Sequence, residues 1–155
     1  MSKNFLGLDP STKSTGYGIL DKNEKLLASG TIEGRTDNPE SFIKLHNEIE
    51  ELILKHNIGH VLIEDTFFSR NVDTLKKLVR PSGVILYLVG LYELTHDFIM
   101  PSSWRKLAFG SGKTTKRETY EILNKRYELG FTSFNKNNDI TDAIGIALAC
   151  VQTYK

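Results

Sequence analysis

The sequence is poor in several features that mark particular protein classes. Its 155 residues include one cysteine, Cys150, which excludes an internal disulfide framework and a zinc site built on several cysteines. The longest apolar run, residues 83–92, is well short of the ~20 residues of a membrane-spanning helix. The N-terminal residues contain no apolar stretch of the signal-peptide kind. We therefore expect a cytoplasmic protein with no membrane partner and an ordinary hydrophobic core.

An excess of charge of one sign is also missing. The 20 Lys and Arg residues are balanced by 19 Asp and Glu residues, so the formal net charge is +1. Nucleic-acid-binding domains are often strongly basic, and this sum alone does not favour one. The basic residues are gathered, however, because residues 104–126 hold seven of them against two acidic residues. That segment and residues 69–80 are either phosphate-binding regions or solvated helix faces.

Hydrophobic periodicity predicts a meander of three strands, followed by helices and strands in alternation. Apolar runs predict strands over 4–9, 17–20, 25–32, 60–64 and 97–100. Helical spacing predicts helices over 39–55, 72–95, 102–109, 115–127 and 139–153, with residues 132–138 as a loop. Pro81 is expected to kink or interrupt the second helix. The order predicts one α/β domain over 1–155, with helices on the faces of a mixed sheet.

Four carboxylates stand at chemically suggestive places. Asp9 and Glu64 each end an apolar strand, and Asp139 and Asp142 lie three residues apart on one face of the last helix. Taken singly, they have ordinary interpretations as a turn cap, a solvated strand end and compensation of a helix dipole. Together they can surround one space if the strands are neighbours. Oxygen ligands of this kind suit Mg²⁺ or Mn²⁺, and two such ions ~3.5–4 Å apart can promote phosphodiester cleavage.

The ordered set of motifs resembles the RuvC-type Holliday junction resolvases. The matching segments are 7–11 with 15–18, Ile63-Glu64, and 139–147 at the final helix. The resemblance implies an RNase H-like fold with a five-stranded mixed sheet flanked by helices. It implies a homodimer that cuts four-way DNA junctions with two Mg²⁺ ions per active site, Mn²⁺ being an alternative. The metal-binding catalytic acids would be Asp9, Glu64, Asp139 and Asp142.

Several further residues are candidates for contact with DNA. The resemblance places Phe67, with Phe68 beside it, where an aromatic residue touches bases, although a hydrophobic staple into the next helix is the competing interpretation. It also places basic contacts in the segment after residue 101, while Trp104 is expected to pack beside the sheet. The complete set of candidate DNA-binding residues is Phe67, Phe68, Arg70, Lys76, Lys77, Arg105, Lys106, Lys113, Lys116 and Arg117.

The leading hypothesis is a metal-dependent endonuclease selective for four-way and related branched DNA. The small size and lysine-rich composition suit a phage-encoded member acting in a bacterial cytoplasm. Two alternatives use the same fold: a ribonuclease-H-type enzyme acting on RNA–DNA hybrids, and a non-catalytic junction-binding module. An actin-like ATPase shares the opening strand-and-turn motif, but it needs two related lobes, and 155 residues supply one.

Overall fold

A five-stranded mixed sheet forms the centre of the protein in a computed structural model that describes residues 2–11, 13–34, 38–65 and 71–155. The strands lie in the order β3-β2-β1-β4-β5. The first three pair antiparallel, whereas β4 runs parallel to β1 and β5 runs parallel to β4. The predicted mixed sheet is confirmed. The strand bounds are β1 Asn4–Pro10, β2 Ser14–Leu20, β3 Leu26–Glu33, β4 Ile58–Glu64 and β5 Thr95–Ile99.

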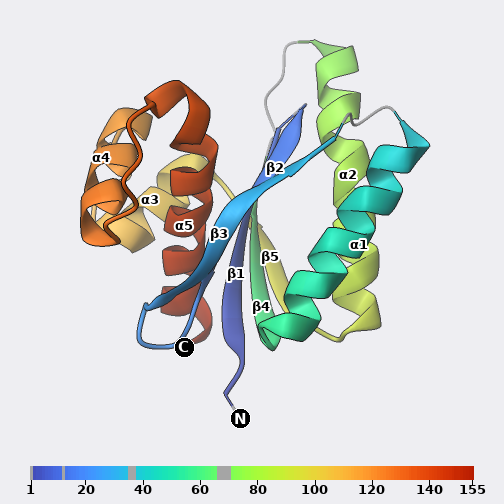
Figure 1. Ribbon diagram of the computed structural model, residues 1–155, viewed down its shortest axis with the longest axis horizontal. Coiled ribbons are helices and arrows are strands. Elements are labelled where there is room, and N and C mark those ends of the chain that lie inside the picture. Colours follow the sequence, from blue (N-terminus) through green and yellow to red (C-terminus); the bar gives the residue numbers. More distant parts are fainter. Residues whose placement is uncertain (1, 12, 35–37, 66–70) are drawn as a thin grey trace.

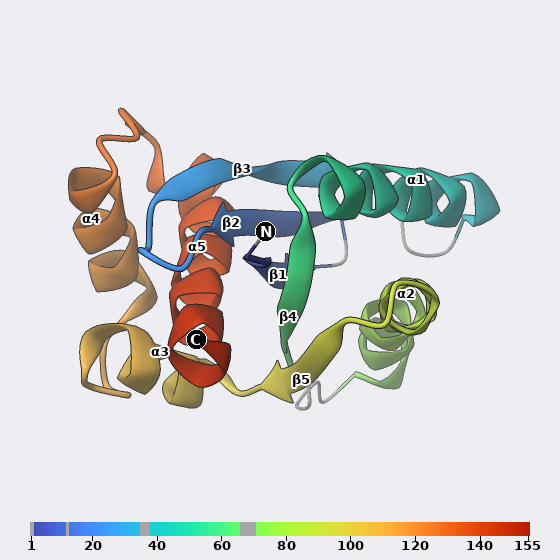
Figure 2. The ribbon, with the colours of Figure 1, turned by 90° about the horizontal axis from the view of Figure 1, so that it is seen from below.

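Helices cover both faces of this sheet. α1 and α2 lie on one face, and α3, α4 and α5 lie on the other, as Figures 1 and 2 show from two directions. No helix in the described part of the chain is long and apolar enough to cross a membrane. The helix bounds are α1 Pro39–Lys55, α2 Val72–Leu91, α3 Pro101–Phe109, α4 Lys116–Arg126 and α5 Phe134–Tyr154.

Two predicted helices differ from those observed. The second helix ends at Leu91, and it runs through Pro81 without the expected interruption, because the proline ring is buried in the tertiary structure. The last helix begins at Phe134, within the segment predicted as a loop. Ser133 caps this start by accepting a hydrogen bond from the Lys136 amide, and Phe134 packs edge-on against Tyr120. Asp139 therefore lies in the second turn of α5, where compensation of the helix dipole no longer explains it.

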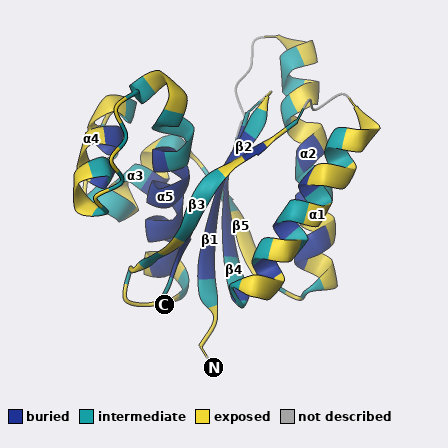
Figure 3. Ribbon diagram, viewed as in Figure 1, coloured by how far each residue is buried: buried dark blue, intermediate teal, exposed yellow. Residues whose placement is uncertain are grey.

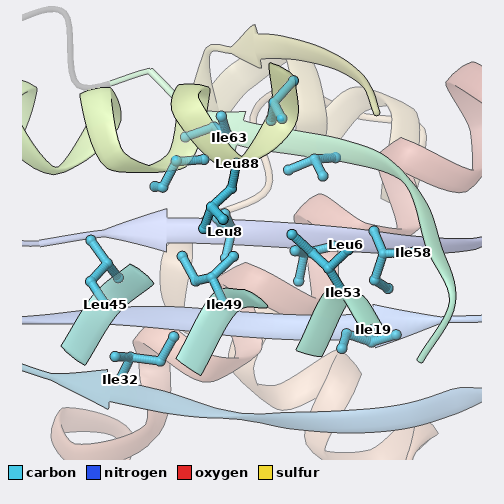
Figure 4. Packing of buried hydrophobic residues seen from close by; sticks show 13 residues of the cluster. Leu6, Leu8, Ile19, Ile32, Leu45, Ile49, Ile53, Ile58, Ile63 and Leu88 are labelled. Carbon is cyan, nitrogen blue, oxygen red and sulfur yellow. The ribbon is translucent and has the colours of Figure 1, made fainter. Parts of the chain in front are cut away.

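The alternation of residues along β1 sends side chains into two separate cores. Leu6 and Leu8 point toward α1 and α2, where Figure 4 shows them among Leu45, Ile49 and Leu88. Phe5, by contrast, belongs to the cluster formed with α5. Gly7 and Asp9 have the same parity as Phe5, so the face of β1 that carries Asp9 is the face that α5 covers.

Helix α5 packs on this face at unusually short range. Every residue from Thr141 to Val151 is buried, and Figure 3 shows the middle of the helix dark. A Cβ placed on Gly7 would lie 2.3 Å from the Ala143 carbonyl oxygen and 2.4 Å from the Ala147 amide nitrogen. Only a residue without a side chain fits between β1 and the helix backbone. The glycine therefore sets how closely the middle of α5 approaches β1.

This packing predicts that Gly7→Ala destabilises the protein strongly. The added methyl group meets backbone atoms of α5, which cannot move aside as a side chain would, so a loss of roughly 3 kcal/mol is expected. Gly90→Ala is the matched control, because nothing lies within 4 Å of its Cβ position in α2. It should be neutral or stabilising by up to about 1 kcal/mol. Chemical denaturation of both variants measures the difference, and equal stabilities would contradict the close-packing argument.

Candidate active site

The register of two parallel strands brings Asp9 and Glu64 together. Leu8 of β1 pairs with Ile63 of β4, and the two carboxylates occupy the next positions along each strand. Neighbouring strands lie ~4.8 Å apart, so the two residues are adjacent at the same edge of the sheet. Leu62, which has the same parity as Glu64, packs in the core under α5. Both carboxylates therefore start from the sheet face that α5 covers.

Helix α5 adds two more carboxylates to this place. Gly16 pairs with Asp9 across β1 and β2, and a Cβ on Gly16 would lie 2.5 Å from the Asp139 carbonyl oxygen. The second turn of α5 thus rests directly on the strand position beside Asp9. The Asp142 side chain is 1% exposed and that of Asp139 is 37% exposed. All four predicted acidic residues gather at one site with a buried interior and an open rim.

The electrostatics of the site agree with close approach of these carboxylates. Burial raises the pKa of Asp9 well above its usual value, and repulsion from Glu64 and Asp142 raises it further. Burial also raises the pKa of Asp142 to about 6, although attraction to Lys116 opposes the change. Among the described residues, neither Asp9 Oδ2 nor Asp142 Oδ1 has a hydrogen-bond partner, although both are buried. Two buried oxygens therefore lack the partners that such atoms normally have.

Lys116 supplies the main positive charge at the site. Its Nζ atom lies 2.5 Å from Asp142 Oδ2 and 3.5 Å from Asp139 Oδ1. Burial alone would lower the pKa of Lys116, but attraction to Asp142 and the other carboxylates outweighs burial and raises it. A capping box between Thr115 and Glu118 fixes the start of α4, where Lys116 is the first helical residue. The ammonium group therefore neutralises part of the carboxylate charge.

Two residues of α3 also reach the carboxylates. Arg105 Nη2 lies 4.0 Å from Asp142 Oδ2, and Trp104 Nε1 donates a hydrogen bond of 2.8 Å to Glu64 Oε2. The expected packing of Trp104 beside the sheet is confirmed, since its side chain is fully buried. Its polar contact escaped the sequence analysis because the partners are 40 residues apart and no local pattern links them. A buried tryptophan needs a partner for its N–H group, and this need is the one signal in the sequence that could have indicated a polar contact of Trp104.

The carboxylate site fits a hard divalent cation by its chemistry. Its potential ligands are oxygens, and two of the buried ones lack partners. Within the described residues, no three His, Cys, Asp or Glu side chains stand arranged around a common metal position, and the Lys116 ammonium group lies among the carboxylates. A metal ion would therefore have to compete with this ammonium group, and the carboxylates would turn toward it.

The remaining candidate DNA-binding residues are spread around the site. Lys106 on α3, Lys113 in the loop after it and Arg117 on α4 are exposed, and Arg117 also lies 4.3 Å above the Phe134 ring. Lys76 and Lys77 are exposed on α2, over the opposite sheet face. Contact of these five residues with DNA stays a prediction, as it does for Arg105 and Lys116. Phe67, Phe68 and Arg70 lie outside the described residues.

The raised pKa values predict that the metal-free site costs stability at high pH. The pKa of Asp142 rises from 3.8, the usual value of an aspartate side chain, to about 6 in the folded protein, so the folded state binds the proton more tightly. Folding stability from this group is therefore present at low pH and is lost as the pH rises between about 4 and 6. Asp9 acts in the same direction.

Asp9→Asn should consequently raise the Tm measured in EDTA at pH 8 by a few degrees, because 1 kcal/mol corresponds to roughly 2–4 °C in a chain of this size. The gain should shrink toward pH 4. Asp97→Asn removes a charge from an exposed side chain of β5 and is the control. A Tm of Asp9→Asn at or below that of the wild type at pH 8 would contradict the electrostatic argument.

Two solved structures share the fold of this chain. The structure of Thermus thermophilus RuvC in complex with a Holliday junction substrate matches with a TM-score of 0.78 and 18% sequence identity, over 96% of this chain and 92% of that chain. The yeast mitochondrial Holliday junction resolvase Ydc2 matches with a TM-score of 0.63 and 15% identity, over 95% and 77% of the two chains. At these identities the likeness concerns the fold, and it agrees with the predicted five-stranded mixed sheet.

Sequence comparison adds closer relatives. The crossover junction endodeoxyribonuclease RuvC of Sulfurovum sp. is 35% identical over 161 residues, which cover 98% of this chain and 97% of the relative. The RuvC of Aliarcobacter butzleri is 32% identical over 156 residues, covering 96% and 97%. The family described as crossover junction endodeoxyribonuclease RuvC matches residues 5–150, a span that holds all four clustered carboxylates. The chain belongs to the RuvC family of crossover junction endodeoxyribonucleases.

Proposed function

We propose that this crossover junction endodeoxyribonuclease resolves four-way DNA junctions with one acidic site, formed by Asp9, Glu64, Asp139 and Asp142. The observation that carries the proposal is the convergence of these four side chains at one edge of the sheet, with two buried oxygens left without partners. We further propose that residues 1–155 act as a single nuclease domain, since one sheet and the helices packed on it carry every part of the site. The Thermus thermophilus relative binds a Holliday junction substrate, and this chain is expected to bind the same substrate.

The family implies metal dependence, and the proposed ions are two Mg²⁺, with Mn²⁺ as the alternative. When bound, such ions supply an activated water and stabilise the leaving oxygen of the phosphodiester. Asp9, Glu64 and Asp142 would hold the ions from within the site, and Asp139 would hold them from the exposed rim. Lys116, which pairs with Asp142 in this structure, would then be free to contact a phosphate group.

The charge distribution supports DNA as the substrate. Exposed basic residues lie on α2, α3 and α4, which cover both faces of the sheet, and such residues can bind the phosphate backbone. A ribonuclease-H-type activity on RNA–DNA hybrids would use the same carboxylates. Comparison of cleavage rates on hybrid, linear duplex, flap and four-way substrates separates the two activities, and preference for the four-way junction supports the proposal.

We predict that Asp9→Asn abolishes junction cleavage while junction binding in EDTA persists. The substitution removes one ligand charge at the centre of the site, and a loss of at least roughly 100-fold in cleavage rate is expected. Asp97→Asn removes an equal charge from an exposed part of β5 and should cut at the wild-type rate. The measurement is nicking of a synthetic four-way junction with Mg²⁺ or Mn²⁺. Equal rates for Asp9→Asn and the wild type would contradict the assignment.

We also propose that the chain acts as a homodimer, because two symmetric cuts are most simply made by two symmetric active sites. The face on which a second copy would dock is an apolar groove between α1 and α2. Ile43 and Tyr87 are 61% and 62% exposed there, and the Tyr87 ring lies 6.1 Å from the His46 ring. The groove is lined by Phe42, Ile43, His46, Arg80, Gly83, Val84 and Tyr87.

The dimer proposal predicts that Tyr87→Glu produces monomers and removes paired cutting of opposed strands. A charge in the centre of an apolar interface has no partner and costs a large part of the association energy. Ile122→Glu, on the exposed side of α4 over the other sheet face, is the control and should leave the dimer intact. Sedimentation at micromolar concentration measures both. Finding the wild type monomeric under these conditions would contradict the proposal.

A further inference from the structure

We propose that Trp104 is a positioning residue, which fixes the Glu64 carboxylate for metal binding and whose fluorescence reports occupancy of the site. The inference rests on the proposed function, because it takes Glu64 to be a metal ligand. It concerns a contact that crosses from α3 to the end of β4. Among the described residues, no other side chain donates a hydrogen bond to Glu64, so this contact decides how the carboxylate is held.

The hydrogen bond itself has a defined direction. An indole N–H group can only donate, so Glu64 Oε2 is the acceptor in the contact of 2.8 Å with Trp104 Nε1. One of the two carboxylate oxygens is thereby engaged, and the other is left for a cation. A glutamate side chain at a strand end would otherwise sample several rotamers, and binding a metal would have to restrict them.

The indole ring is held on several sides and cannot easily turn away. It is fully buried, and it occupies the space that a side chain at position 145 would need: a Cβ on Gly145 would lie 2.5 Å from Trp104 Cζ3. Phe109 meets the ring edge-on at 6.4 Å, and the Arg105 guanidinium lies 4.8 Å from its centre. The ring is therefore a rigid support for Glu64, built from α3 and α5.

The same support links two of the acidic residues. Arg105 covers the Trp104 ring and also lies 4.0 Å from Asp142 Oδ2. Because Trp104 Nε1 donates its hydrogen bond to Glu64, a change at Glu64 on metal binding would act directly on the indole N–H group. Trp104 is the one tryptophan of the chain, so intrinsic tryptophan emission comes from this position alone.

The first measurement is the affinity of the full chain for Mn²⁺, determined by calorimetry without DNA. Trp104→Phe keeps an aromatic ring and removes the N–H group. Loss of a group that orients a metal ligand typically weakens metal binding roughly 10- to 100-fold, and we expect a change in that range. Tyr127→Phe is the matched control, because it removes a different hydrogen bond, of 2.7 Å to the Glu24 carbonyl oxygen at the opposite end of α4, and should bind Mn²⁺ as the wild type does.

The second measurement uses the wild-type fluorescence. Titration with Mg²⁺ should shift the Trp104 emission and saturate, and Glu64→Gln, which keeps an acceptor for the indole but lacks the charge, should give no saturable shift. In junction cleavage, Trp104→Phe should lower kcat and leave KM for the junction unchanged. A defect confined to packing would instead lower thermal stability without this division between kcat and KM.

The outcomes separate this inference from the proposed function. A wild-type chain that binds no Mn²⁺ overturns the metal-dependent function and the inference with it. Wild-type binding together with equally tight binding by a folded Trp104→Phe overturns the positioning role alone. If Trp104→Phe does not fold, the wild-type titration decides, and a Trp104 emission that stays constant while Mg²⁺ binds overturns the inference.

Discussion

The close packing of α5 against β1 and β2 is the constraint on which the candidate active site depends. Gly7 and Gly16 leave no side chain between the strands and the helix. Carbonyl oxygens of α5 lie within 2.5 Å of the positions that Cβ atoms of these two residues would take. This distance brings Asp139 and Asp142 over the strand that carries Asp9. A larger spacing would preserve the order of the elements but move the helical carboxylates away from the strand carboxylates.

The same closeness makes the site electrostatically unfavourable without a cation. Asp9 and Asp142 are buried beside other carboxylates, and the pKa of each is raised because the charged form is poorly solvated and repelled. Lys116 offsets part of this cost through contacts with Asp139 and Asp142. Native proteins commonly keep such strained arrangements at functional sites, where the rest of the fold supplies the stability that they lose. A cation bound among these carboxylates would relieve their mutual repulsion.

One short segment connects the basic and acidic parts of the molecule. From α3 and the start of α4, Trp104 contacts Glu64, Arg105 approaches Asp142, and Lys116 bridges Asp139 and Asp142. The near-zero net charge of the sequence is therefore a cancellation between basic and acidic residues, and charged surfaces are present. Metal ions at the carboxylates would neutralise the acidic part and leave the exposed lysines and arginines to face the DNA backbone.

Local patterns in the sequence determined the strand and helix order, the two strand-end carboxylates and the pair on the last helix, because each depends on periodicity or on spacing along the chain. The start of α5 was wrong in the sequence analysis, since Phe134 and Ser133 stabilise it through contacts and capping that a polar, asparagine-rich segment does not indicate. The continuous helix through Pro81 likewise depends on burial. Only the tertiary structure decided that Lys116 lies on the carboxylates and that Trp104 holds Glu64, because these contacts join residues 23 to 40 positions apart, and side-chain pairing over such distances has no local signature.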